Sequence, residues 1–187
     1  DVRIDKSASG NTDIEELTGF DDGGVITFNS IITDLAGNST TGTASTTTVT
    51  VDQIAATVTG ITSSTDNGIY NTGDLIAVDI SFDDNITLTD GGSFDITMES
   101  GSVDNSISIT SLTNSNSATA NYTVQIGDSN ADLYVKTLSI AGGYLIDVAG
   151  NPMAGADLNT PTNMDTPKDI EIDGIDPDAF TVSSVTT

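Results

Sequence analysis

The chain has 187 residues, with 28 acidic and 4 basic side chains, a formal net charge of −24 at pH 7, and no His, Cys or Trp. Without His or Cys it lacks the nucleophile–base pairs of most hydrolases and the usual ligands of zinc and iron–sulfur centres, so we expect no enzyme activity. Nucleic-acid phosphates and anionic membranes repel such a polyanion, and no apolar stretch is long enough for direct membrane insertion.

Short runs of alternating apolar residues between Gly, Asn and Asp turn signals predict an all-β chain. Of the 28 acidic residues, 24 are Asp and 4 are Glu, and Asp favours turns over helix interiors. The strands expected between residues 53 and 175 are Thr57–Thr62, Leu75–Phe82, Ser93–Glu99, Ser106–Thr113, Thr119–Ile126, Tyr134–Ile140, Tyr144–Asp147 and Lys168–Asp173. This spacing predicts an antiparallel β-sandwich with Greek-key connections of the immunoglobulin type.

An internal repeat divides the chain. The segment Ile32–Asn38 returns as Leu145–Asn151, with Asp34 and Asp147 separated by 113 residues, and Thr48–Asp52 returns as Asp169–Asp173. A repeat of this length is the size of a domain, which predicts tandem sandwich units. We expect an incomplete C-terminal part of one unit, or a very short unit, at 1–52, a complete unit at 53–175, and the first strand of a following unit at 176–187.

Four ordered motifs carry a resemblance to a known family. They are Val51–Ile61, Thr65–Ile76, Tyr122–Asp128 and Asp147–Asn151. Together they resemble the bacterial Ig-like repeats of large secreted adhesins and other cell-surface proteins, over residues 20–187. The resemblance implies tandem Ig-like domains in a secreted or cell-surface stalk, commonly with Ca²⁺ stiffening the junctions, and it does not imply catalysis.

The chain departs from the pattern of that family in one linker. The usual linker Pro is replaced by Ala55 or Ala56, whereas Pro177 is present in the downstream linker. The stiffness of the first junction is therefore an open question.

The positions of the Asp residues predict a cation site. In immunoglobulin topology alternate loops and the two linkers gather at opposite poles, and Ca²⁺ takes about six to eight oxygen ligands from carboxylates, carbonyls and water. The N-terminal pole of the unit at 53–175 gathers Asp52, Asp83, Asp84 and Asp147, and its C-terminal pole gathers Asp66, Asp74, Asp128 and Asp132 with the linker residues Asp173, Asp176 and Asp178. The candidate Ca²⁺ ligands are Asp21, Asp22, Asp34, Asp52, Asp83, Asp84, Asp147, Asp173, Asp176 and Asp178.

A purely structural interpretation of the same residues stays open. Asp caps turn amides, so a chain with 24 of them places some at every pole by chance. Asp34 and Asp147 fit the role of turn cap as well as that of ligand, and we expect Gly37 and Gly150 after them to supply positive φ. High acidity is also typical of proteins adapted to saline habitats.

These observations predict a non-enzymatic extracellular spacer of a repetitive surface adhesin or surface-layer-type protein, with junctions rigidified by Ca²⁺. One alternative is a self-assembling filament or lattice subunit, in which the strand at Phe180–Val185 is donated to another copy. A second is a glycan- or protein-binding module that uses the inserted loop Ala154–Asp165. The expected partners are neighbouring Ig-like units of the same or another copy, and a host or surface glycan or protein.

Overall fold

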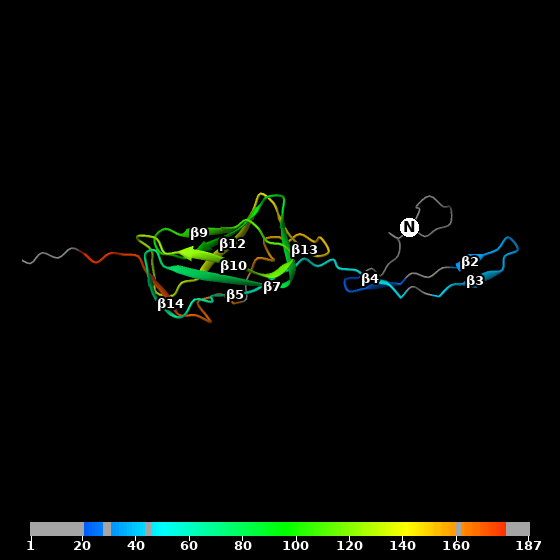
Figure 1. Cartoon of the computed structure of the whole chain (residues 1–187), viewed down its shortest axis with the longest axis horizontal. Coiled ribbons are helices and arrows are strands. Elements are labelled where there is room, and N and C mark those ends of the chain that lie inside the picture. Colours follow the sequence, from blue (N-terminus) through cyan, green and yellow to red (C-terminus); the bar gives the residue numbers. More distant parts are fainter. Residues whose placement is uncertain (1–20, 28–30, 44–45, 160–161, 179–187) are drawn as a thin grey trace, which may run out of the picture. The chain divides into compact units, whose positions relative to one another are not determined.

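The computed structural model describes residues 21–27, 31–43, 46–159 and 162–178. Within these ranges all regular structure is β-strand and no helix occurs, which confirms the all-β prediction. The described part of the chain also contains no helix that is long and apolar enough to cross a membrane. The chain forms two compact units, Asp1–Ile54 and Ala55–Thr187, and each is described by itself (Figure 1).

The described part of the first unit forms two antiparallel ribbons. Strand β1 (Val25–Thr27) pairs with β4 (Thr48–Thr50), and β2 (Ile31–Thr33) pairs with β3 (Ser39–Thr41) across the turn at 34–38. The side chains of β2, β3 and β4 are exposed. Two-stranded ribbons bury little apolar surface, and the buried apolar cluster of the described residues lies within the second unit.

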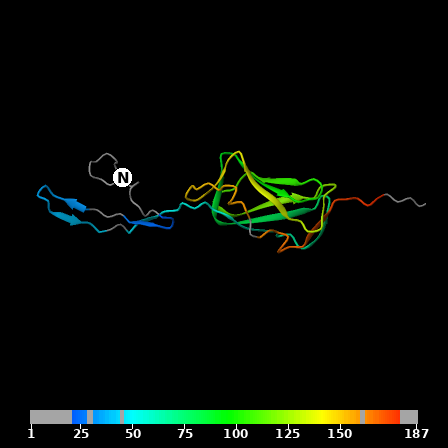
Figure 2. The same cartoon turned by 180° about the vertical axis from the view of Figure 1, so that it is seen from behind.

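The second unit is built around β7 (Leu75–Thr89). This strand pairs antiparallel with β5 (Val58–Thr62), β10 (Ser115–Thr123) and β13 (Tyr144–Asp147). These four strands form the largest sheet of the described residues. They lie across from a second group of strands in both views of the unit (Figures 1 and 2).

Two three-stranded sheets complete the unit. In one, β8 (Ser93–Met98) lies between β9 (Asn105–Ile109) and β12 (Val135–Ala141), and both pairs are antiparallel. In the other, β14 (Ile170–Asp173) lies antiparallel to β11 (Ser129–Asn130) and parallel to β6 (Gly68–Asn71). The β6–β14 pair is the one parallel pair among the described strands.

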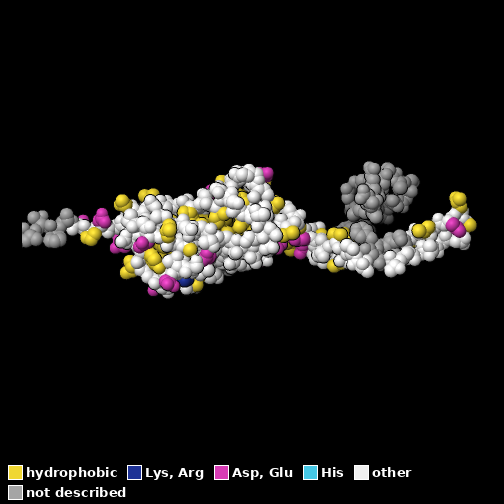
Figure 3. Space-filling view, viewed as in Figure 1, with side chains coloured by type: hydrophobic (Ala, Val, Ile, Leu, Met, Phe, Trp, Pro, Cys, Tyr) yellow, Lys and Arg dark blue, Asp and Glu magenta, His cyan; other side chains and the backbone are white. Residues whose placement is uncertain are grey.

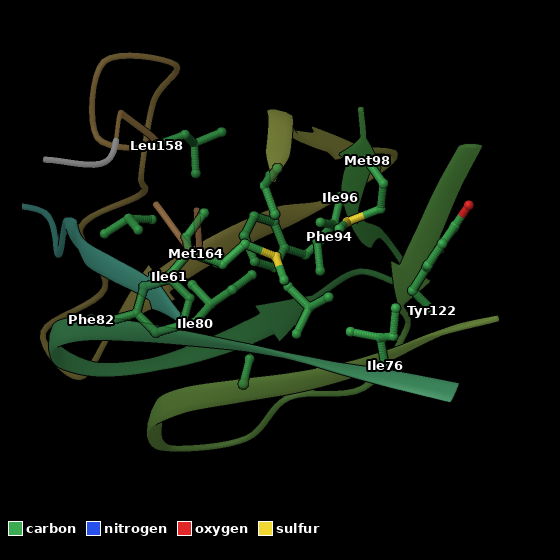
Figure 4. Close-up of a cluster of buried hydrophobic side chains, with 14 of the residues drawn as sticks. Ile61, Ile76, Ile80, Phe82, Phe94, Ile96, Met98, Tyr122, Leu158 and Met164 are labelled. Atoms are coloured by element: carbon green, nitrogen blue, oxygen red, sulfur yellow. The ribbon is translucent and has the colours of Figure 1, made fainter. Parts of the chain in front are cut away.

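The core of the second unit follows from the alternation of apolar residues, because every second side chain of a strand points to the same face. On β7 these are Ile76, Val78, Ile80 and Phe82, and on β8 they are Phe94, Ile96 and Met98. All of them belong to one buried cluster, in which the rings of Phe82 and Phe94 have centroids 6.0 Å apart (Figure 4). The inner faces of the two sheets therefore contact each other in a sandwich-like arrangement.

The prediction that the second strand ends at Phe82 was wrong. Strand β7 continues to Thr89 and contains Asp83 and Asp84, which we expected in a loop. It exchanges its partner β5 for β13 in this region, and its register with β10 shifts between Ser115↔Ile86 and Ser117↔Ser81. Between these register pairs, residues of β7 such as Asp83 and Asp84 have no partner on β10. The irregularity bends the strand, so that the next apolar residue, Ile86, again lies in the core.

Candidate functional site

The hairpin that follows β13 is organised by Asp147. Its Oδ1 accepts hydrogen bonds from the backbone N–H groups of Gly150 at 2.7 Å and Asn151 at 2.8 Å, and its Oδ2 accepts one from Asn151 Nδ2 at 2.8 Å. The Asp147 residue is only 4% exposed. Gly150 has φ 99°, as expected from the sequence, because the turn requires a residue that tolerates the left-handed region.

The first unit contains the same hairpin. Oδ1 of Asp34 accepts hydrogen bonds from the N–H groups of Ala36 and Asn38, each at 2.9 Å, and Oδ2 accepts one from Asn38 Nδ2 at 2.9 Å. Gly37 has φ 89°. The bond from the Asn38 side chain is the main reason why the pKa of Asp34 lies below its ordinary value. Asp34 and Asp147 are therefore both turn caps, whether or not either also binds an ion.

Asp83 holds the segment that leads into β5. Its Oδ1 accepts a hydrogen bond from Thr57 N–H at 2.6 Å, and its Oδ2 accepts one from the Thr57 hydroxyl at 2.7 Å. Desolvation acts to raise the pKa of Asp83, but these two bonds outweigh it, and the pKa lies below its ordinary value. Both oxygens of Asp83 are thus engaged in positioning Thr57.

Asp84, the next residue, lies close to Asp147. A carboxylate oxygen of Asp84 and one of Asp147 are within 4.8 Å of each other. Oδ1 of Asp84 accepts a hydrogen bond from the adjacent Asn85 N–H at 2.6 Å. Two carboxylates at this separation offer hard oxygen donors to a divalent cation and repel each other without one.

Three predicted ligands, Asp21, Asp22 and Asp52, belong to the first unit, in which the turn that contains Asp21 and Asp22 is hydrogen-bonded to the segment 51–53. Asp21 begins the turn with Gly24, whose N–H donates to the Asp21 carbonyl at 2.8 Å. Oδ1 of Asp22 accepts a hydrogen bond from Gln53 N–H at 2.8 Å, and Oδ1 of Asp52 accepts one from Ile54 N–H at 3.3 Å. All three Asp residues are exposed.

At the C-terminal end of the second unit, Asp173, Asp176 and Asp178 are exposed and line an open hollow together with Glu171. Oδ1 of Asp173 accepts a hydrogen bond from Ile175 N–H at 3.1 Å. The face of the unit drawn in Figure 3 has acidic side chains near both of its ends.

Asp74 and Asp132 were also expected at the C-terminal pole, although not as ligands, and their environments differ. Oδ2 of Asp74 accepts a hydrogen bond from Asn71 N–H at 2.9 Å and caps the turn before β7. Desolvation, followed by repulsion from Asp165 and Asp169, raises the pKa of Asp132.

Asp128 points into the protein, although sequence reasoning placed it among the pole residues. It is 4% exposed and accepts hydrogen bonds from the Tyr122 hydroxyl, from Gln125 N–H at 2.7 Å and from Asn105 Nδ2 at 2.9 Å. Desolvation, reinforced by the bond to Asp128, raises the pKa of Tyr122 to about 12. The sequence signal was Tyr122 itself, since it occupies a core-facing strand position and a buried Tyr hydroxyl needs a partner.

Comparisons of the chain with protein-family models, with curated proteins and with solved structures gave no match.

Proposed function

We propose that this chain is a non-enzymatic extracellular spacer segment made of tandem Ig-like units, in which Ca²⁺ rigidifies the junction between consecutive units. The observation that carries the proposal is the repetition of one hairpin in two units, in which the Asp carboxylate accepts from both the backbone N–H and the side-chain amide of the Asn four residues later. Asp34 with Asn38, and Asp147 with Asn151, make the same side-chain bond at 2.9 and 2.8 Å. A recurring structural unit in a chain without the residues of common active sites favours a repetitive structural role.

The strand pairing of the second unit supports the Ig-like assignment. In the immunoglobulin arrangement the first, second and fifth strands share one sheet, and the third, sixth and seventh share the other. The neighbours β5-β7-β10 correspond to the first group and the neighbours β8-β12 to part of the second, whereas β14, the last strand, lies in a separate sheet with β6 and β11. The additional pairing of β13 with β7 distinguishes this unit from the simplest form of the fold.

The pair Asp84 and Asp147 supports the position of the ion. Both belong to the end of the second unit at which Asp83 holds Thr57. The linker that precedes Thr57 carries Asp52, which is the third carboxylate of the proposed site. Ca²⁺ is favoured over Mg²⁺ because ligands drawn from a strand, a turn and a linker do not enforce a tight octahedron.

The proposed rigidity arises from the short linker. Within the first unit Asp22 binds the backbone of Gln53, and within the second unit Asp83 binds the backbone of Thr57. Few rotatable bonds separate these two anchors, and Asp52 lies immediately before the first of them. Binding of this carboxylate by an ion held on Asp84 and Asp147 would restrict the remaining freedom of the linker.

The test is a distance measurement between the units. Spin labels on Thr40→Cys and Ser102→Cys occupy exposed positions in the first and second unit of a chain without native Cys. We expect the distance distribution to narrow in millimolar Ca²⁺ and to stay broad in chelator or in Mg²⁺. Equal widths in Ca²⁺ and chelator would contradict the proposal. The same labels on an Asp84→Asn background are the control, and this variant is expected to stay broad in Ca²⁺.

A further inference from the structure

Four peptide bonds of the chain join Asp or Asn to Gly. They are Asp22–Gly23, Asn67–Gly68, Asp90–Gly91 and Asp173–Gly174. At such a bond the backbone nitrogen of Gly can attack Cγ of the preceding side chain, because Gly has no Cβ to hinder the approach. Each bond is therefore open to a spontaneous rearrangement, which the fold permits or prevents.

The rearrangement passes through a five-membered succinimide ring. The Gly nitrogen forms a bond to Cγ and loses its proton, and the side chain of Asp loses its hydroxyl as water, or that of Asn its amide as ammonia. Water then opens the ring at one of its two carbonyl carbons. Opening at the former Cγ gives Asp. Opening at the main-chain carbonyl gives an isoaspartyl residue, in which the chain runs through the side chain and has one more atom in its backbone.

In three of the four bonds the Gly N–H group is held by a backbone hydrogen bond. The donors and their carbonyl acceptors are Gly23 and Val51 at 2.8 Å, Gly68 and Asp169 at 3.0 Å, and Gly174 and Asp128 at 2.7 Å. A nitrogen that is fixed in this way reaches Cγ only after the local structure has opened. These hydrogen bonds therefore slow the formation of the ring.

Asn67–Gly68 is the bond at which this protection matters most. The uncharged Asn amide accepts a nucleophile more readily than the carboxylate of Asp, whose negative charge repels it, so Asn67 reacts first in an unfolded chain. In the fold, Gly68 is the first residue of β6 and pairs with Ile170 of β14. The strand pair thus fixes the nitrogen that would attack.

Asp90–Gly91 lacks this protection. The two residues form the turn between β7 and β8, which is closed by a hydrogen bond from Gly92 N–H to the Thr89 carbonyl at 3.2 Å. Their φ angles of 58° and 67° are both positive, as in a type I′ turn. Both residues are exposed, and among the described residues neither the Asp90 carboxylate nor the Gly91 N–H group has a hydrogen-bond partner.

We infer that Asp90 is the site at which the folded second unit forms isoaspartate spontaneously, whereas the fold protects Asn67 and Asp173. The carboxyl group and the nitrogen that react are exposed and unbonded in the same turn, and solvent supplies the water that opens the ring. Protection at Asp22 is weaker, because two-stranded ribbons are marginally stable. The inference goes beyond the proposed spacer role and needs neither an ion nor a neighbouring unit.

The modification alters a closely packed corner of the second unit. Strands β7 and β8 belong to different sheets, which this turn connects. A Cβ on Gly92 would lie 2.7 Å from Gly143 Cα, and a Cβ on Gly143 would lie 2.3 Å from the Thr89 carbonyl oxygen. Residues on both sides of Asp90–Gly91 thus contact the same backbone, and an additional main-chain atom between them must displace it. We therefore expect the isoaspartyl chain to unfold at a lower urea concentration than the unmodified chain.

The first experiment compares the folded chain with the same chain in guanidinium chloride, at one neutral pH and one temperature. Isoaspartate is measured in the peptides around Asn67, Asp90 and Asp173 by methyl transfer with an L-isoaspartyl methyltransferase. We expect folding to slow the reaction by about tenfold or more at Asn67 and Asp173, where local opening must precede it, and far less at Asp90. Slowing of the reaction at Asp90 to the same degree as at the other two positions would overturn the inference.

A second experiment uses Asp90→Asn, which places two Asn–Gly bonds of the second unit in one molecule. Asn–Gly is a preferred pair in a type I′ turn, so we expect this variant to fold. Mass spectrometry of the peptides follows the loss of ammonia at each position. In the folded variant we expect position 90 to react before Asn67, and in guanidinium chloride we expect the two positions to react at similar rates. Earlier reaction of Asn67 in the folded variant would refute the protection that the inference requires.

Discussion

The hydroxyl of Tyr122 donates a hydrogen bond to the buried carboxylate of Asp128, six residues further along the chain. Asn105 Nδ2 donates to the same carboxylate at 2.9 Å. Tyr122 is 1% exposed, and β9, β10 and the turn at Asp128 meet at this buried polar group. Buried groups of this kind make a fold sensitive to the loss of any one partner.

The pair predicts an alkaline unfolding transition. Folding raises the pKa of Tyr122 to about 12 from its ordinary value of 10.0, so its contribution to stability is complete below pH 10 and is lost as the pH rises toward 12. We expect the free energy of unfolding to fall by about 2 to 3 kcal/mol over that range. Urea unfolding followed by near-ultraviolet circular dichroism measures the free energy of unfolding of the second unit. The Tyr signal reports on this unit because all four Tyr residues lie there and Trp is absent.

Tyr122→Phe removes both the bond and the titration. We expect it to lower stability at pH 7 by about 1 to 3 kcal/mol, because Asp128 loses a buried donor, and to flatten the alkaline transition. Tyr144→Phe is the matched control, since Tyr144 is 57% exposed. If Tyr122→Phe keeps the full alkaline transition, the assignment is wrong.

The two copies of the hairpin provide an internal comparison. Asp147→Ala leaves the part-buried N–H groups of Gly150 and Asn151 and the Asn151 amide without their acceptor, so we expect a loss of about 2 to 4 kcal/mol in the free energy of unfolding of the second unit. Asp34 accepts from the N–H groups of Ala36 and Asn38 and from Asn38 Nδ2 in an exposed turn, where water replaces these bonds. We expect Asp34→Ala to leave the second-unit transition unchanged in a urea titration, and an equal effect of both variants would contradict this account.

Asp83 predicts a loss of stability in acid. Its folded-state pKa lies below its ordinary value of 3.8, so its contribution to stability is present above about pH 4 and is lost as the pH falls through the folded-state pKa. Asp83→Asn is expected to lower the melting temperature at pH 7 and to reduce its further decline between pH 4 and 2. Asp79→Asn, on the same strand, serves as the control in thermal melts across this range, and an identical acid profile for both variants would argue against a special role of Asp83.

Alternation was sufficient to predict most strands of the second unit. Residues such as Phe94, Ile96 and Met98 alternate without interruption, and their strand was located to within one residue. The continuation of β7 beyond Phe82 was not predicted, because two consecutive Asp residues, Asp83 and Asp84, are typical of the end of a strand. The change of partner from β5 to β13 depends on residues that are distant in sequence. The short strands β6 and β11 lie in turn-rich sequence with no alternation to mark them.

The candidate site was predictable to a similar degree. The topology argument placed Asp84 and Asp147 at the same pole, and their carboxylates are within 4.8 Å of each other. The inward direction of Asp128 was not predicted. The topology indicates which end of the sandwich a residue occupies, but not whether its side chain points into the core. That direction depends on Asn105, which no local pattern links to Asp128, and on Tyr122, whose core-facing strand position was the one signal in the sequence.

Close backbone packing at the C-terminal end predicts a severe effect of a single methyl group. A Cβ on Gly174 would lie 2.2 Å from the Gln125 carbonyl oxygen, whereas a Cβ on Gly155 would meet nothing within 4 Å. We expect Gly174→Ala to cost about 2 kcal/mol or more through forced movement of the turn, and Gly155→Ala to change little. Urea unfolding measures the free energy of unfolding of the two variants. Equal values would show that the turn at Gly174 accommodates the methyl group without cost and would contradict this prediction.

A calcium-stiffened junction requires Ca²⁺ to bind the folded chain through Asp84 and Asp147. The most direct measurement is thermal unfolding in Ca²⁺, Mg²⁺ and chelator at matched ionic strength, for the natural chain, Asp84→Asn and Asp83→Asn. Binding to the folded state alone adds about 2.7 kcal/mol at a hundred times the dissociation constant. We predict a Ca²⁺-specific rise in melting temperature that Asp84→Asn abolishes and Asp83→Asn largely keeps. If Ca²⁺, Mg²⁺ and monovalent salt act alike, or if both variants respond equally, the calcium junction is refuted.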